Sequence, residues 1–362
     1  MKYIKKIIKI SFIFIIVLVV LFILISCRTN PYTGSIKNKN KNLEDSKYEN
    51  DTIFKDRWNK KDLRLGSILK TNSQYVLYYA GADNYYKYSV GVSFSKDLIN
   101  WEDYEFNPVI KSNNIKWEFN GIFEPAVIIK DNNYFMWYPS ANGGKEHIGL
   151  ATSKDGINWQ KYDKNPVISP EFNDGWESSG IDEPAVIYED NKFFMWYTGM
   201  DNNRNYAIGL ATSNDGINWQ KYDKNPVLRC RIKNNFDQFG VMDPTVFFKN
   251  GEFVMLYVGY NSPQGGESYI NLATSKDGIN WQKYDNNPVM TPYDINNQWE
   301  AGGLIEPILI LDNNKIYCLY SGISKLSDGR KVQTGLSISK DFKSWEKIGI
   351  TSLKNTQNDW WY

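Results

Sequence analysis

The stretch Ala151–Val167 reads ATSKDGINWQKYDKNPV, and it returns almost unchanged at Ala211–Val227 and at Ala273–Val289. A looser copy precedes these three at Ser93–Val109, and a more divergent one follows them at Leu336–Ile348. The conserved tryptophans of the five copies recur about every sixty residues. Five copies at a nearly constant period indicate a repeat architecture.

Each copy is predicted to form a β-hairpin. Asp-Gly supplies the positive-φ positions of a tight turn between the apolar run and the alternating WQKY. Two further β-rich runs lie upstream in each repeat, such as Gly121–Ile129 and Tyr134–Tyr138. Four strands in each of five repeats predict an all-β, five-bladed β-propeller with four antiparallel strands per blade, since ring closure leaves few exposed sheet edges. A β-sandwich would not account for five near-equal units.

The first 27 residues are predicted to be a signal peptide and not part of the fold. A basic start precedes the apolar run Ile10–Ile25, and the run ends in Ser26-Cys27. This ending resembles a bacterial lipobox, which implies that Cys27 is lipidated and becomes the first residue of the mature protein. An uncleaved membrane anchor is the alternative. Both interpretations place the rest of the chain on the extracellular face of the cell membrane.

Residues 28–52 are rich in Lys, Asn and Ser and are expected to form a flexible tether before a propeller domain at 53–362. The net charge of +1 gives no attraction to nucleic acid. We expect a monomer that contacts the membrane through its lipid alone.

One histidine and scattered cysteines exclude any familiar zinc site. Cys230 and Cys318 leave a disulfide open, although a buried thiol is expected for Cys318.

One column of the aligned repeats carries acidic residues, each followed by proline. Its members are Glu124, Glu183, Asp243 and Glu306, with Asp182 directly before Glu183. The first strand of each blade lines the propeller axis, so these carboxylates are expected to converge at one mouth of the channel. Like charges that are brought together raise one another's pKa, which is typical of catalytic or metal-binding sites. The alternative is that each carboxylate holds backbone N–H groups of the neighbouring blade, or an arginine.

The loops between the second and third strands are expected at the same mouth. They contribute Lys145, Arg204, Arg330 and Tyr260 as candidate substrate-binding residues, together with Tyr85, Tyr86 and His147. The opposite mouth receives the Asp-Gly turns, which hardly vary. Variation on one face is typical of a binding face.

Blades that open with an acid-Pro pair and end with S-x-D-G-x-x-W resemble the five-bladed glycosidases, which include glycoside hydrolase families 43, 32, 62, 68 and 130. The resemblance implies cleavage or transfer of sugar units of an oligo- or polysaccharide by acidic residues at the starts of inner strands. Residue by residue, it carries over Glu124 and Asp182. The chain departs from the pattern at Leu65, where enzymes like family 43 place an aspartate base.

The predicted roles follow from this resemblance and from the acidic column. Asp182 and Glu183 are the candidate acids, Asp243 is the candidate base, Glu124 orients, and Glu306 binds substrate. A cell-surface glycoside hydrolase-like enzyme is the first hypothesis, and a non-catalytic carbohydrate-binding surface protein is the second. A phosphorylase is the third, in which Lys145, Arg204 and Arg330 cradle phosphate. No cofactor is required, and Ca²⁺ in the central channel is left open.

Overall fold

The computed structural model of the chain describes residues 58–59, 61–71, 73–113, 117–142, 145–171, 175–230, 236–262, 267–292, 299–325, 331–353 and 356–357. The chain divides into the units Met1–Asn50 and Asp51–Tyr362, and all described residues belong to the second. The predicted signal peptide, Cys27, the tether and Arg330 lie outside the described residues. Within the ranges above, no helix is long and apolar enough to cross a membrane.

The described part of the chain is all-β, and its strands follow one another in antiparallel groups. The first group is β1 (Asp62–Lys70), β2 (Tyr75–Ala82), β3 (Tyr88–Ser95) and β4 (Trp101–Asp103), with β5 (Ile110–Lys111) beside β3. The second is β6 (Ala126–Lys130), β7 (Asn133–Asn142), β8 (Lys145–Ser153) and β9 (Trp159–Lys161). The third is β10 (Gly180–Glu189), β11 (Lys192–Met200), β12 (Tyr206–Ser213) and β13 (Gln220–Lys221).

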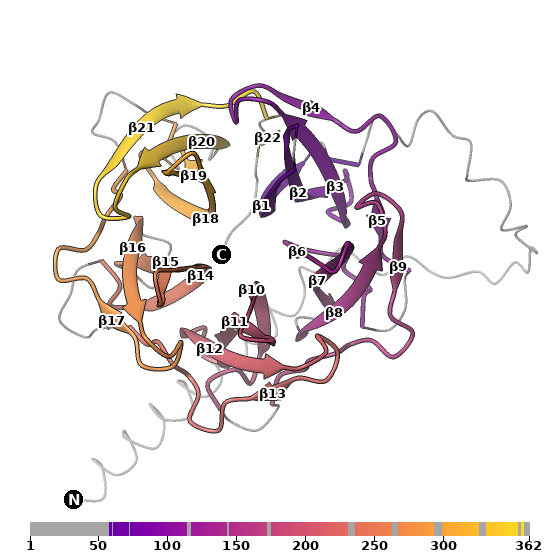
Figure 1. The fold of residues 1–362 in the computed structure, drawn as a ribbon, viewed down its shortest axis with the longest axis horizontal. Helices are drawn as coiled ribbons and strands as arrows, with labels where there is room; N and C mark the ends of the chain where they lie inside the picture. The colour runs from indigo at the N-terminus through magenta and orange to yellow at the C-terminus, as the bar shows by residue number, and fades with distance from the viewer. Residues whose placement is uncertain are drawn as a thin grey trace, which may run out of the picture. The chain divides into compact units, whose positions relative to one another are not determined.

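The later groups repeat this order. One is β14 (Gly240–Lys249), β15 (Glu252–Tyr260), β16 (Ser268–Ser275) and β17 (Gln282–Lys283). The other is β18 (Gly303–Asp312), β19 (Lys315–Ile323), β20 (Lys331–Ser339) and β21 (Trp345–Ile350), with β22 (Thr356–Gln357) beside β20. The groups surround a common axis, and β1, β6, β10, β14 and β18 lie nearest to it (Figure 1). These innermost strands contact one another in sequence, and β1 also contacts β18.

The repeated Asp-Gly segment forms the predicted hairpin turn. In the second group, the Ser153 hydroxyl accepts the N–H groups of Asp155 and Gly156, and the Asp155 carboxylate accepts the two N–H groups after the glycine. Gly156 has a φ of +76°, a conformation that glycine adopts without strain. The first and last groups place Leu98 and Phe342 at this position, with φ of 67° and 63°. The hairpin prediction is confirmed.

Aromatic residues of β7 and β11 pack between neighbouring groups. Trp137 on β7 is fully buried in a cluster with Phe193 and Tyr197 of the next group. Its indole N–H donates to the Gly216 carbonyl at 2.9 Å, and Trp196 makes the same bond one group later. Buried indoles need such a partner, so each tryptophan also fixes the position of the next group's turn.

A buried ion pair recurs at the outer side of the groups. The pairs are Lys161–Glu118, Lys221–Glu177, Lys283–Asp237 and Lys347–Glu300. In each pair the acid also accepts a tyrosine hydroxyl, from Tyr138, Tyr197, Tyr257 or Tyr320. The first group places Asn59 and Asp103 at these positions, and the Tyr79 hydroxyl donates to Asp103 instead. The charges differ, but the buried tyrosine keeps an acidic partner.

The first and last groups close the ring by packing and by hydrogen bonds. Leu65 and Leu77 share a buried cluster with Ile308 and Leu353. The Ser352 N–H donates to the Ile99 carbonyl at 2.8 Å, and the Ser352 hydroxyl accepts the backbone N–H of Trp101 at 2.7 Å. The first and last groups are therefore neighbours.

Candidate active site

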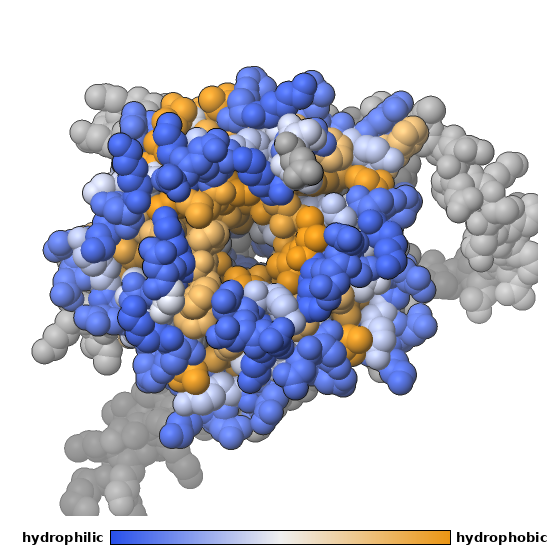
Figure 2. All heavy atoms as spheres, viewed as in Figure 1, coloured by the Kyte–Doolittle hydropathy of each residue, from blue (hydrophilic) through white to orange (hydrophobic). Residues whose placement is uncertain are grey.

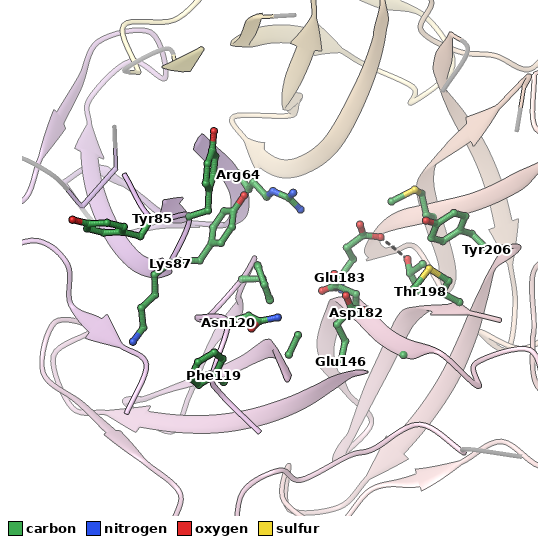
Figure 3. Close-up of a pocket in the computed structure, with 17 residues that line it drawn as sticks. Arg64, Tyr85, Lys87, Phe119, Asn120, Glu146, Asp182, Glu183, Thr198 and Tyr206 are labelled. Carbon is green, nitrogen blue, oxygen red and sulfur yellow. Dashed lines mark hydrogen bonds between the residues drawn. The ribbon is translucent and has the colours of Figure 1, made fainter. Parts of the chain in front are cut away.

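A pocket of about 650 Å³ is lined by residues of the first three groups, together with Met242. Three lining side chains are carboxylates, Asp182, Glu183 and Glu146, and two are cations, Arg64 and Lys87 (Figure 3). The face seen in Figure 2 is hollowed at its centre, and hydrophobic residues gather around this hollow. A concave site with a few convergent polar groups is the usual form of a ligand site.

Asp182 and Glu183 lie on β10 at a bulge, where the pairing with β11 shifts between Asp182 and Ala185. Glu183 has a φ of 51°, so the two successive carboxylates do not alternate as they would in a regular strand. The Asp182 carboxylate accepts the N–H of Glu183 at 2.8 Å. The Glu183 carboxylate instead accepts the Thr198 hydroxyl at 2.7 Å and the N–H of Asp243 at 2.9 Å.

The acids of the repeated column form a chain of hydrogen bonds around the axis. Beyond Glu183, the Asp243 carboxylate accepts the N–H of Glu306 at 2.9 Å. The Glu306 carboxylate accepts the N–H of Leu65 at 3.0 Å. These three acids therefore hold the backbone of the next group, as the alternative interpretation of the column expects. Together with Glu124 they line an axial channel of only about 30 Å³.

Glu124 is held by an arginine. Its carboxylate accepts Arg64 Nη1 at 3.0 Å, and Arg64 Nε donates to Asp62 at 3.0 Å. The Arg64 guanidinium also lies over the Tyr88 ring, 5.2 Å from its centroid. The first group thus supplies a cation next to Leu65, where the acidic column is interrupted. Burying a charged group is costly unless it is paired, and this guanidinium supplies the pairing.

Glu146 is the site residue that the sequence analysis missed. It lies near the start of β8 between Lys145, which is exposed, and His147, whose ring bonds the Ser169 hydroxyl. Side chains alternate along a strand, so the residue between these two candidates points to the other face. A Cβ at Gly180 would lie 2.6 Å from the Glu146 carboxylate. The sequence does contain a signal for this residue. In the aligned repeats, Glu146 is the acidic member of the column Tyr88, Glu146, Tyr206, Ser268 and Val332.

The pocket raises the pKa of its carboxyl groups. Burial raises the pKa of Glu146 to about 7, and the charge of Glu124 adds to this while Arg64 opposes it. Burial raises the pKa of Asp182 well above its usual range, with further contributions from Glu124 and Glu146. Burial and the charge of Asp243 do the same for the Glu183 pKa. Carboxyl groups that titrate at different pH values within one pocket are what acid–base catalysis requires.

The other predicted residues lie around this centre or away from it. Arg204 is exposed on the turn before β12, and Tyr260 is half-buried with its ring 6.5 Å from that of Tyr206, which lines the pocket.

Cys230 and Cys318 are free thiols, and Cys318 is buried as expected. Among the described residues, no three His, Cys, Asp or Glu side chains are placed to hold a metal ion together.

Comparison with known proteins identifies the family. The family described as "Glycosyl hydrolases family 32 N-terminal domain" matches residues 37–177, 66–226, 134–270 and 230–361, which overlap to span nearly the whole chain. The chain belongs to this glycosyl hydrolase family. It is a glycoside hydrolase-like protein, and the resemblance stated from its sequence is confirmed.

Two curated relatives of this glycosyl hydrolase family member come from Thermoanaerobacter sp. (strain X514). A 1,2-beta-oligomannan phosphorylase is 31% identical over 65% of this chain and 80% of its own length. A beta-1,2-mannobiose phosphorylase is 32% identical over 34% of this chain and 44% of its own length. A solved structure reported for the GH130 family of mannoside phosphorylases, which contains glycoside hydrolases that target beta-1,2 mannosidic linkages in Candida mannan, aligns with a TM-score of 0.62 at 19% identity. The alignment covers 79% of this chain and 86% of the chain in the solved structure, and this likeness shows the propeller fold.

Proposed function

We propose that this protein hydrolyses glycosidic bonds of a glycan in the pocket that holds Asp182 and Glu146. The observation that carries the proposal is that these two carboxylates line one pocket and that burial raises the pKa of both. A glycosidase needs one carboxyl group to protonate the leaving oxygen and another to activate water or attack the sugar. The names of the relatives favour β-1,2-linked mannose as the sugar to test first.

Asp182 is assigned as the general acid. Its carboxylate is oriented by the Glu183 N–H, and burial with the neighbouring acids raises its pKa, which favours the protonated form that an acid needs. Glu146 is assigned as the base, which takes a proton from the water that attacks the anomeric carbon as the C–O bond breaks. Glu183 and Asp243 instead support the axis, because their carboxylates bond the backbone of the next group. The sequence-based assignment of Asp243 as base stays a prediction, which the variants described in the Discussion compare with Glu146.

A phosphorylase is the second candidate, and the two curated relatives favour it. Hydrolysis is placed first because Arg64, one of the two cations that line the pocket, already donates to the Asp62 and Glu124 carboxylates. The test is a screen of β-1,2-mannooligosaccharides and other glycans with and without inorganic phosphate. Free sugar without phosphate supports hydrolysis. Sugar 1-phosphate that forms only when phosphate is added supports the phosphorylase, and binding without turnover supports a lectin.

The activity is expected to depend on pH through Glu146. The kcat/KM should fall as the pH drops below about 7, because a base with this pKa becomes protonated there. At higher pH it should fall again as Asp182 loses its proton. The measurement is a pH profile of kcat/KM for the wild type and for Glu146→Gln. An acidic limb near the ordinary glutamate pKa, or one that survives in the residual activity of Glu146→Gln, would argue against this assignment.

We also infer that the propeller has five blades of four strands each. Support comes from the five sequence copies and from the groups β1–β4, β6–β9, β10–β13, β14–β17 and β18–β21 around one axis. A crystal structure tests this count directly. A blade made of other strands, or a sixth blade, would contradict it.

We further propose that the protein is a bacterial lipoprotein, monomeric and held on the extracellular face of the membrane by lipid on Cys27. The apolar run that ends at Ser26-Cys27 supports this placement. Mass spectrometry of the mature amino terminus should find a diacylated Cys27 as the first residue. An intact Met1, or a soluble product that begins beyond Cys27, would contradict the proposal.

A further inference from the structure

The side of the pocket opposite the acids is formed by aromatic rings. Tyr85 is 87% exposed and Phe119 is 62% exposed, and both line the pocket. Figure 3 shows them on one side of the pocket, with Asp182 and Glu146 on the other. Large apolar rings that stay exposed beside a pocket are typical of a binding surface.

The turn that carries Tyr85 does not need aromatic residues in order to fold. The Asp83 carboxylate accepts the N–H groups of Tyr85 and Lys87 at 2.8 and 3.0 Å. Asp201 makes the same two bonds to Asn203 and Asn205 in the third group, at 2.8 and 2.9 Å. The two turns are therefore equivalent, and Tyr85 stands where the third group has an asparagine.

The next position of the two turns leads to the same conclusion. Tyr86 has a φ of 59°, and its counterpart Arg204 has a φ of 62°. A bulky residue in this left-handed conformation is uncommon, so the turn does not select for tyrosine. The backbone of the first group's turn therefore does not require tyrosine at either position.

Other aromatic rings that line the pocket pack against one another. The Tyr88 and Phe123 rings lie 4.9 Å apart between centroids, and both line the pocket. Tyr86 packs against the same small cluster as Tyr88 and Phe123. This cluster fixes Tyr88 and Phe123, which line the same pocket as Tyr85 and Phe119.

We propose that Tyr85 and Phe119 form an aromatic platform that binds further sugar units of a neutral oligosaccharide, beyond the bond cleaved at Asp182 and Glu146. Sugar rings present apolar C–H faces that pack on aromatic rings, while their hydroxyl groups stay in water. The platform lies on the other side of the pocket from the acids, so a longer chain bound at the acids is expected to contact it more than a disaccharide does. This inference rests on the proposed function, and it adds that the enzyme prefers longer chains.

The test compares β-1,2-linked mannotetraose with mannobiose in the wild type and in Tyr85→Asn. The variant copies the residue of the equivalent third-group turn, so it keeps the fold. The kcat/KM for the tetrasaccharide should exceed that for the disaccharide, and Tyr85→Asn should lower the former by about tenfold and leave the latter unchanged. Asn203→Ala, at the matching position of the third group, should change neither value. Melting temperatures of both variants should equal that of the wild type.

If this protein cleaves neither sugar, calorimetric titration with mannotetraose and mannobiose measures binding instead. Tighter binding of the tetrasaccharide that Tyr85→Asn removes would support the platform, although hydrolysis would then be refuted. A loss that is equal for both sugars, no loss in the variant, or no binding of either sugar overturns the platform.

Discussion

Replacing Asp182 by asparagine is expected to lower kcat by about 10²–10⁴-fold with little change in KM. The amide keeps the size of the carboxyl group and its position on β10, but it has no acidic proton to give to the leaving oxygen. The wild-type carboxyl holds this proton because burial and the neighbouring acids raise its pKa. The measurement is steady-state kinetics on the glycan that the activity screen identifies.

A second substrate separates the loss of an acid from a general loss of structure. An aryl glycoside with a good leaving group needs little protonation, so Asp182→Asn should cleave it at nearly the wild-type rate. Equal losses on both substrates would contradict the acid role. Asp243→Asn serves as the comparison, because that side chain bonds the N–H of Glu306. The asparagine amide oxygen can still accept this N–H, so Asp243→Asn should lower the rate less than Glu146→Gln does, and a larger loss would instead support Asp243 as the base.

Replacing Lys283 by methionine is expected to reduce the free energy of unfolding by about 3–5 kcal/mol. Lys283 and Asp237 form a buried ion pair in which the side chains are 6% and 1% exposed. Methionine fills most of the space but leaves the Asp237 carboxylate buried, with the Tyr257 hydroxyl as its remaining partner among the described residues. Lys283 also donates to the Arg229 carbonyl at 2.6 Å, and this bond is lost as well. Urea unfolding measures the change.

Lys276→Met is the matched control. Lys276 pairs with Glu252 at 3.2 Å in the same group, but its side chain is 74% exposed. Exposed ion pairs contribute little to stability, so the free energy of unfolding of this variant should equal that of the wild type. A similar loss of unfolding free energy in both variants, or no loss in Lys283→Met, would show that burial does not determine how much these ion pairs stabilise the fold.

Features that repeat along the chain could be predicted from the sequence. The Ser-x-Asp-Gly turn depends on contacts within a few residues, such as those of Ser153 and Asp155, so local spacing determines it. The burial of Trp137 and Trp196 follows from the aromatic strands in the same way. The acidic column also converges on the axis, since Glu183, Asp243 and Glu306 line one channel.

Features that break the repeat could not be assigned from the sequence. Three acids of the column are alike in sequence, but whether a carboxylate binds substrate or a backbone N–H depends on distances between groups, such as that from Glu306 to Leu65. Glu146 lies in a segment that the sequence predicts to be a loop. The direction of its side chain follows only from the register of β8. The Arg64–Glu124 pair joins residues of different groups that share no motif.

We expect this glycosyl hydrolase family member to cleave a glycan with water through Asp182 and Glu146. The most direct measurement is chromatographic identification of the products from β-1,2-mannotetraose, with and without phosphate, for the wild type and for Asp182→Asn. We predict that the wild type releases free sugar at the same rate in both conditions and that the variant releases almost none. Sugar 1-phosphate as the sole product, or an Asp182→Asn variant as active as the wild type, would contradict the claim.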